Sequence, residues 1–129
     1  MPKVKVARIR NEAIDIKSFE LVPESGSLLP SFTPGSHIDV HLSGGLTRQY
    51  SLCNGPEEVG SYRIAVKREP DSRGGSATMH EQVKEGDSIE IGEPRNNFAL
   101  KPIHGPILLI AGGIGITPVL SMALHLLDA

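Results

Sequence analysis

Four consecutive residues in the middle of the chain could bind a phosphorylated, planar ligand. Arg48, Gln49, Tyr50 and Ser51 lie in the stretch LTRQYSLC, residues 46–53. On a β-strand, Arg48 and Tyr50 share one face and Ser51 points to the other. Arginine offers a planar fork to phosphate oxygens, tyrosine a stacking surface and serine a small hydrogen-bond donor. Ordinary half-exposed strands carry the same residue types, so this short motif needs support from a second element.

A glycine-rich turn supplies that second element. Arg73, Gly74, Gly75 and Ser76 precede a predicted helix over 77–84. Backbone N–H groups at the start of a helix attract anions, and glycines let a phosphate approach the main chain. Ser76 can cap the helix and bind the anion, and Arg73 adds positive charge. A plain loop with a serine cap has the same pattern, so the turn gains its meaning beside the first motif.

A third candidate lies near the C-terminus, between a continuously apolar run and a helix. The residues of this turn are Gly112, Gly113, Ile114, Gly115, Ile116, Thr117 and Pro118. We expect Thr117 to be the N-cap of the helix and Pro118 its first residue. In α/β domains such a glycine loop binds a nucleotide diphosphate. The order is not G-x-G-x-x-G, because Pro118 stands where the third glycine would be, and a tight turn without a ligand stays an alternative.

Short strands must position these motifs. Alternation of apolar and polar residues predicts strands over 3–10, 14–22, 37–43, 46–53, 61–68 and 88–92. Gly44-Gly45 predicts a hairpin between the third and fourth strands. We therefore expect residues 1–100 to form an all-β Greek-key antiparallel barrel with one capping helix.

The remaining residues, 101–129, have a different pattern. The run 106–111 lacks alternation and is typical of a strand buried on both faces of a parallel sheet. We expect this segment to be the first β-turn-α unit of an α/β nucleotide-binding domain. A single strand and helix cannot bury both apolar faces without a neighbour. We therefore expect a piece of a longer protein, and the alternatives are a dimer formed through the 106–129 tail or a tail that packs on the barrel.

Composition argues against several other classes of protein. The net charge is −2, so no basic field exists to attract nucleic acid or an anionic membrane. No uninterrupted apolar stretch is long enough to span a bilayer, and no secretory signal is visible, so we expect a cytoplasmic location.

The one cysteine, Cys53, excludes an internal disulfide and a cysteine-ligated cluster in these residues. We interpret His37, Asp39 and His41 as a solvated strand face and expect no metal site.

Together, the segments PGSHIDVHLSGGLTRQYSLCN, AVKRE, SRGGS, PRNNF and GGIGITP resemble the ferredoxin–NADP reductase-like superfamily. Within it they are most similar to the FMN-containing phthalate dioxygenase reductase and vanillate demethylase reductase group. The resemblance implies a flavin oxidoreductase that passes electrons from NADH through FMN to a [2Fe–2S] centre and an oxygenase partner. Members of the group continue through an NADH domain and a [2Fe–2S] domain. Since neither is completed here, we expect negligible NADH oxidation by this chain alone.

The resemblance also implies roles for individual residues. Arg48 would hold the FMN phosphate, Tyr50 would lie against the flavin and its ribityl chain, and Ser51 would hydrogen-bond near the flavin N5. Thr117 would approach the flavin from the nicotinamide side, so Ser51 and Thr117 are the expected catalytic pair. The other expected flavin-binding residues are Gln49, Ala65, Val66, Lys67, Arg73, Gly74, Gly75 and Ser76. The expected NADH-binding residues are Gly112, Gly113, Gly115, Ile116, Thr117 and Pro118.

Two alternatives to this interpretation stay open. The flavin could be FAD, although arginines at 48 and 73 favour FMN because a terminal phosphate carries more charge than a bridging pyrophosphate. No obvious aromatic run is present to seat an adenine. The chain could also be an isolated flavin-binding or protein-interaction module without turnover.

Overall fold

The computed structural model describes residues 3–24, 28–58, 60–68, 75–96 and 116–127. The predicted strand over 106–111 lies outside them, as do the predicted site residues Arg73, Gly74, Gly112, Gly113 and Gly115. The described strands are β1 (Lys3–Ala13), β2 (Ile16–Pro23), β3 (Ser36–His41), β4 (Thr47–Ser51), β5 (Tyr62–Lys67), β6 (Ser88–Ile91) and β7 (Arg95–Asn96). The described helices are the short 3₁₀ turn η1 (Ser43–Gly45), α1 (Gly75–Glu81) and α2 (Ile116–Leu127).

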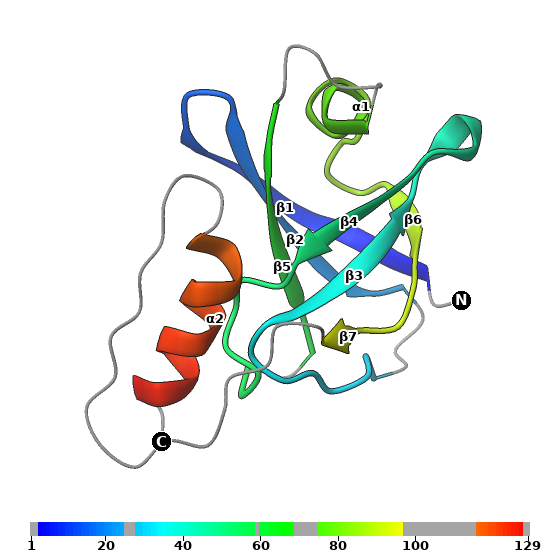
Figure 1. The fold of residues 1–129 in the computed structure, drawn as a ribbon. Helices are drawn as coiled ribbons and strands as arrows, with labels where there is room; N and C mark the ends of the chain where they lie inside the picture. The colour runs from blue at the N-terminus through cyan, green and yellow to red at the C-terminus, as the bar shows by residue number, and fades with distance from the viewer. Residues whose placement is uncertain (1–2, 25–27, 59, 69–74, 97–115, 128–129) are drawn as a thin grey trace.

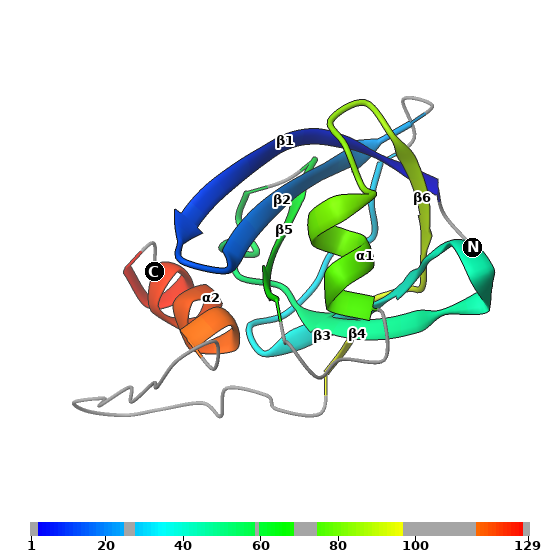
Figure 2. The same cartoon turned by 90° about the horizontal axis from the view of Figure 1, so that it is seen from above.

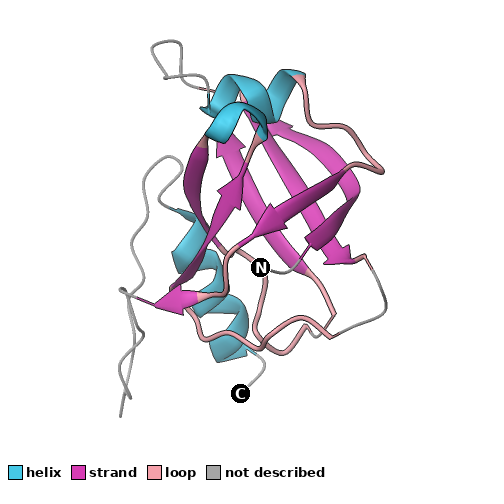
Figure 3. Ribbon diagram, turned by 90° about the vertical axis from the view of Figure 1, so that its right-hand side faces the viewer, coloured by secondary structure: helices cyan, strands magenta, loops and turns pink. Residues whose placement is uncertain are grey.

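The strands form one antiparallel sheet that curls into an open barrel (Figure 1). Its order is β4-β3-β6-β1-β2-β5, with β7 paired to β3. Strand β6 returns to lie beside β3, as the fourth strand of a Greek key does. Helix α1 lies across one end of the barrel (Figures 2 and 3). The predicted barrel with a capping helix is therefore confirmed, although the sheet is not closed by a continuous ladder.

Strand alternation builds the core of the barrel. Inward side chains that are fully or almost fully buried are Val4, Val6, Phe19, Leu21, Ile38, Val40, Ile64, Val66 and Ile91. Each contributes roughly 1.5–3 kcal/mol by leaving water. The Tyr62 ring meets Phe32 edge-on, with ring centroids 5.6 Å apart, and its hydroxyl donates to the Pro30 carbonyl. The core therefore extends into the loop that precedes β3.

The hairpin prediction at Gly44-Gly45 is confirmed, because both glycines have positive φ and form η1. The predicted strand over 14–22 begins later, at Ile16, since Asp15 has a φ of 60° and turns the chain. Ile14 consequently lies in the turn and is 91% exposed.

Both helices begin earlier than predicted. Helix α1 starts at Gly75 and ends at Glu81, and the residues up to Lys84 are not helical. Helix α2 starts at Ile116, so Thr117 lies in its first turn instead of capping it. Glycine and proline signals locate a helix end only to within a residue or two, which accounts for both differences. In the part of the chain that the structure describes, no helix is long and apolar enough to cross a membrane.

A buried asparagine ties the end of β4 to the start of β5. The Asn54 side chain is fully buried; its Nδ2 donates to the Ser61 carbonyl and its Oδ1 accepts from the Arg63 N–H, both at 3.0 Å. Replacing it with a smaller apolar residue would leave both backbone groups without this partner.

We therefore predict that Asn54→Ala lowers the free energy of unfolding by about 2 kcal/mol, the scale of a buried polar group left unsatisfied. Urea denaturation followed by circular dichroism measures this change. Asn11→Ala, at an exposed position of β1, is the matched control and should change stability by less than about 0.5 kcal/mol. Equal changes in the free energy of unfolding for the two substitutions would contradict a stabilising role of the Asn54 hydrogen bonds.

Candidate functional site

Strands β4 and β5 lie side by side, but no ladder joins them in the part of the chain that the structure describes. They are linked just past the end of β4, where the Cys53 N–H donates to the Arg63 carbonyl at 2.8 Å. In an antiparallel pair, bonded positions recur at every second residue. Continuing from the Cys53–Arg63 bond therefore sets Ser51 opposite Ala65 and Gln49 opposite Lys67.

The direction in which alternate backbone groups of β4 point also leaves these residues at the edge of the sheet that has no ladder. The Leu42 N–H donates to the Leu46 carbonyl and the Leu52 N–H to the Ser36 carbonyl, so even-numbered residues of β4 bond to β3. Odd-numbered residues therefore turn their N–H and C=O groups away from β3. We call this edge, formed by Gln49, Ser51, Ala65 and Lys67, the β4–β5 seam. It offers backbone donors and acceptors that a ligand with a polar edge could pair.

The side chains of β4 follow the expected alternation. Arg48 pairs with Val40 and Tyr50 with Ile38, so both lie on the face of the core residues. Tyr50 packs against the core and is half-buried, and burial raises the pKa of its phenol although the Arg48 guanidinium opposes the shift. Gln49 and Ser51 occupy the outer face. Ser51 is half-buried there.

The first two motifs meet at Arg48 and Gly75. A Cβ atom built on Gly75 would lie 2.5 Å from Arg48 Nε, 2.6 Å from its Cγ and 2.9 Å from its Cδ. Only glycine leaves room for the arginine stem at this point, and the Arg48 Nη1 also donates to the Thr47 carbonyl at 2.8 Å. Ser76, the next residue, is buried at the start of α1. We call Arg48, Gly75 and Ser76 the arginine cradle.

A histidine that the sequence analysis missed connects the cradle to the seam. The buried His80 Nε2 donates to the Val66 carbonyl at 2.6 Å, because a carbonyl can only accept. Lys17 Nζ donates to the His80 carbonyl at 2.9 Å. Helix α1 is thereby fixed to β5. The Val66 carbonyl is bonded to His80 and its side chain lies in the core, while Ala65 and Lys67 lie at the seam; the flavin-binding roles of these three residues stay predictions.

Helix α2 packs on the segment that follows β4. A Cβ atom at Gly55 would lie 3.2 Å from Leu124 Cβ, and His125 Nδ1 bonds to Glu57 Oε1. Thr117 is buried in the first turn of α2, and Ile116 beside it is half exposed. The helix that carries Thr117 therefore lies against the loop that follows Ser51 in the chain.

Two other features lie apart from the seam. Asp39 Oδ1 accepts from Arg95 Nη2 at 2.8 Å and His41 Nδ1 bonds to Thr47 Oγ1 at 3.0 Å. Among the described residues, no group of three or more His, Cys, Asp or Glu side chains is placed to hold a metal ion.

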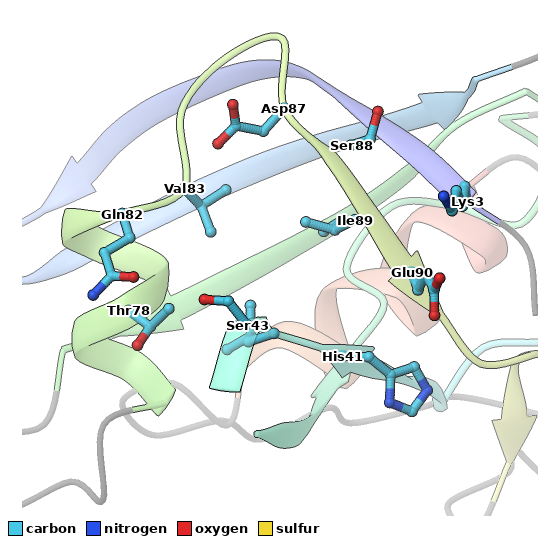
Figure 4. Close-up of a pocket in the computed structure, with 11 residues that line it drawn as sticks. Lys3, His41, Ser43, Thr78, Gln82, Val83, Asp87, Ser88, Ile89 and Glu90 are labelled. Atoms are coloured by element: carbon cyan, nitrogen blue, oxygen red, sulfur yellow. The ribbon is translucent and has the colours of Figure 1, made fainter. Parts of the chain in front are cut away.

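A cavity of about 550 Å³ between α1, the hairpin and β6 contains none of the predicted site residues (Figure 4).

Cys53 lies at the end of the seam where β4 and β5 are joined by a backbone hydrogen bond. Its side chain is buried, and its Sγ donates to the Arg63 carbonyl at 3.3 Å. Burial raises the pKa of the thiol to about 11, although the nearby Arg63 guanidinium acts in the opposite direction. A thiol with so high a pKa is not a nucleophile near neutral pH.

Comparison with known proteins identifies the family. The family model for the oxidoreductase FAD-binding domain matches residues 3–100. A vanillate O-demethylase oxidoreductase of Pseudomonas putida is 56% identical over 113 residues, which are 88% of this chain and 36% of that protein. A phthalate dioxygenase reductase of Burkholderia cepacia is 45% identical over 124 residues, 96% of this chain and 38% of that protein.

Solved structures agree with these relatives. A phthalate dioxygenase reductase, described as a modular structure for electron transfer from pyridine nucleotides to [2Fe–2S], superposes with a TM-score of 0.94 at 44% identity. The match covers 98% of this chain and 39% of that one. An intact type IV self-sufficient cytochrome P450 monooxygenase gives a TM-score of 0.88 at 40% identity, covering 95% of this chain and 16% of that one. The chain thus spans less than half the length of these relatives.

Because Cys53 is the only cysteine, thiol reagents report on it alone. Raising a thiol pKa from 9.0 to about 11 lowers the thiolate fraction at pH 8 about 100-fold, so we predict correspondingly slow alkylation of the folded protein by iodoacetamide. The Cys53 thiol ionises at a lower pH in the unfolded protein than in the folded one. Its ionisation therefore lowers the free energy of unfolding as the pH rises from about 9 to 11. Alkylation at the same rate in native buffer and in 6 M urea, taken as a roughly unfolding concentration, would contradict the burial of Cys53.

Proposed function

Because the chain belongs to the oxidoreductase FAD-binding domain family, we propose that its β4–β5 seam and arginine cradle bind one flavin. The contact between Arg48 and Gly75 is the observation that carries the proposal. It unites a cation from β4 with a glycine turn at the start of α1, next to the open edge of the sheet. A flavin nucleotide needs both features, since it has a phosphate at one end and a polar ring edge at the other.

The residues fit the ligand chemically. The pyrimidine edge of a flavin carries alternating carbonyl and N–H groups, which match the backbone groups of Ala65 and Lys67 that no described residue pairs at the seam. Arg48 can pair with phosphate oxygens, and the missing Cβ of Gly75 keeps the arginine stem in place. Ser51 on the same seam can hydrogen-bond the N5 edge of the ring.

The flavin we propose is FMN. The guanidinium groups of Arg48 and Arg73 suit a terminal phosphate, which carries more charge than one group of a bridging pyrophosphate. FAD is the second candidate, because the matched family is described by FAD binding. Release of the flavin by heat and identification by mass distinguishes them: FMN is expected, and FAD would overturn this choice.

For the whole protein we propose a reductase of an oxygenase system. Residues 1–100 would be the flavin domain and residues 101–129 the start of an NADH domain, with Gly112, Gly113, Gly115, Ile116, Thr117 and Pro118 in the nicotinamide nucleotide site. When bound, the flavin supplies the chemistry: it accepts a hydride and releases electrons singly, which suits a [2Fe–2S] acceptor. Ser51 and Thr117 would orient the reacting ring from opposite sides. The names of the relatives support this proposal.

The chain alone is expected to bind flavin without turnover. We predict that the 129-residue protein, loaded with FMN, oxidises NADH at a negligible rate with ferricyanide as acceptor, because residues 101–129 would supply only the start of the proposed NADH domain. A spectrophotometric assay at 340 nm measures this. Sustained NADH oxidation would contradict the expectation.

Arg48→Ala should weaken FMN binding by roughly 1.5–3 kcal/mol, the scale of a hydrogen bond to a charged group. Fluorescence titration of FMN, quenched on binding, gives the dissociation constants. Arg10→Ala, at an exposed position of β1, is the control for lost positive charge and should leave the affinity unchanged. If Arg48→Ala binds FMN as tightly as the unchanged protein, Arg48 does not hold the phosphate.

Gly75→Ala tests the cradle without removing any charge. The new Cβ must displace Arg48, so FMN affinity should fall about tenfold or more, up to the loss predicted for Arg48→Ala. Gly92→Ala is the matched control, because a Cβ there meets only Asp39 at an ordinary 3.4 Å. Equal FMN affinity of the two variants would remove Gly75 from the site.

A further inference from the structure

The outer face of the β3–β4 hairpin carries two pairs of a histidine and a hydroxyl residue. His41 pairs with Thr47, and His37 pairs with Ser51. Even-numbered residues form the backbone bonds between these strands, so both pairs occupy positions without backbone bonds, where opposite side chains approach most closely. The two pairs therefore have the same local geometry, one beside η1 and one at the β4–β5 seam.

At the hairpin end the imidazole and the hydroxyl are bonded. His41 Nδ1 lies 3.0 Å from Thr47 Oγ1. The contact demonstrates that a histidine on β3 reaches a hydroxyl directly opposite on β4. His37 stands directly opposite Ser51 in the same register, and Ser51 carries its hydroxyl on Cβ as threonine does.

At the seam no such bond is formed among the described residues, and the nitrogen left without a partner is Nε2 where His41 uses Nδ1. His37 Nε2 is buried and has no hydrogen-bond partner in the part of the chain that the structure describes. On its other side His37 is opposite Arg95, but that guanidinium is bonded to Asp39. Among the described residues Ser51 also makes no side-chain hydrogen bond. A buried ring nitrogen without a partner is unfavourable, and it calls for an explanation in a native fold.

We propose that His37 is a positioning residue for Ser51, whose hydroxyl it directs toward the flavin N5 edge. This inference rests on the proposed flavin site. Imidazole can donate or accept at Nε2, and a hydroxyl does both, so the pair can present Ser51 to the ring as a donor or as an acceptor. A ring nitrogen that accepts when oxidised and donates when reduced needs such a reversible partner. His37 acts through Ser51 and does not itself contact the flavin.

The test compares the affinities for oxidised and dithionite-reduced FMN, and takes their ratio. Ser51→Ala and His37→Leu should each change this ratio by the same factor, about 3–10-fold. The double variant should change it no further than either single one, since both substitutions break one hydrogen-bonded unit. His37→Gln, which keeps a donor and an acceptor, should restore much of the ratio. His41→Leu, at the equivalent pair away from the seam, should leave it unchanged.

Other outcomes overturn the proposal. If His37→Leu leaves the ratio unchanged, or if its effect adds to that of Ser51→Ala, the positioning role is wrong while the flavin site stands. If the unchanged protein binds no FMN, the proposed function itself fails and the inference with it.

A second measurement needs no variant at His37 and so does not depend on the folding of His37→Leu. With imidazole nitrogens labelled, addition of FMN should shift the His37 Nε2 resonance in the unchanged protein and leave it unshifted in Ser51→Ala. Equal shifts in both proteins would contradict the pairing of His37 with Ser51.

Discussion

Among the described residues, the antiparallel barrel has no ladder between β4 and β5, the first and last strands in the order of the sheet. Strands β4 and β5 join at the Cys53–Arg63 bond and run on beside each other without a ladder. Backbone groups at a sheet edge must pair with something, and most proteins block or cover such edges. Here the edge borders the arginine cradle, so a polar, planar ligand can complete the hydrogen bonding that the sheet leaves open.

Contacts far apart in the sequence hold the elements around this edge. Asn54 fixes the closed end, and His80 fixes α1 to β5 through the Val66 carbonyl. Gly75 then sets how closely α1 approaches Arg48. The proposed flavin site needs its phosphate-binding end and its ring-binding edge at a fixed separation, and the contacts of these three residues hold the elements that would carry them. The polar positions of the site are thus supported by buried side chains that the ligand does not need to touch.

Much of this arrangement could be predicted from local patterns. Alternation located the strands, and Gly44-Gly45 located the hairpin, because both signals act over a few residues. The position of β6 between β1 and β3, and the resulting gap beside β4, could not be read in the same way, since strand partners are chosen by packing across the whole barrel. His80 was missed because nothing near it in the sequence indicates that its partner is a carbonyl on β5. The ligand-binding roles of all the predicted site residues stay predictions, and Arg73 and the glycines at 112, 113 and 115 also lie outside the residues that the structure describes.

Amide hydrogen exchange reports on the open edge of the sheet residue by residue. In the protein without ligand, the amides of Ala65 and Lys67 should exchange as fast as other unpaired edge amides. On saturation with FMN we predict marked slowing at these two residues and unchanged exchange at Gly60, in the exposed loop before β5. FMN binding that leaves Ala65 and Lys67 unprotected would show that the flavin lies elsewhere and would contradict the account.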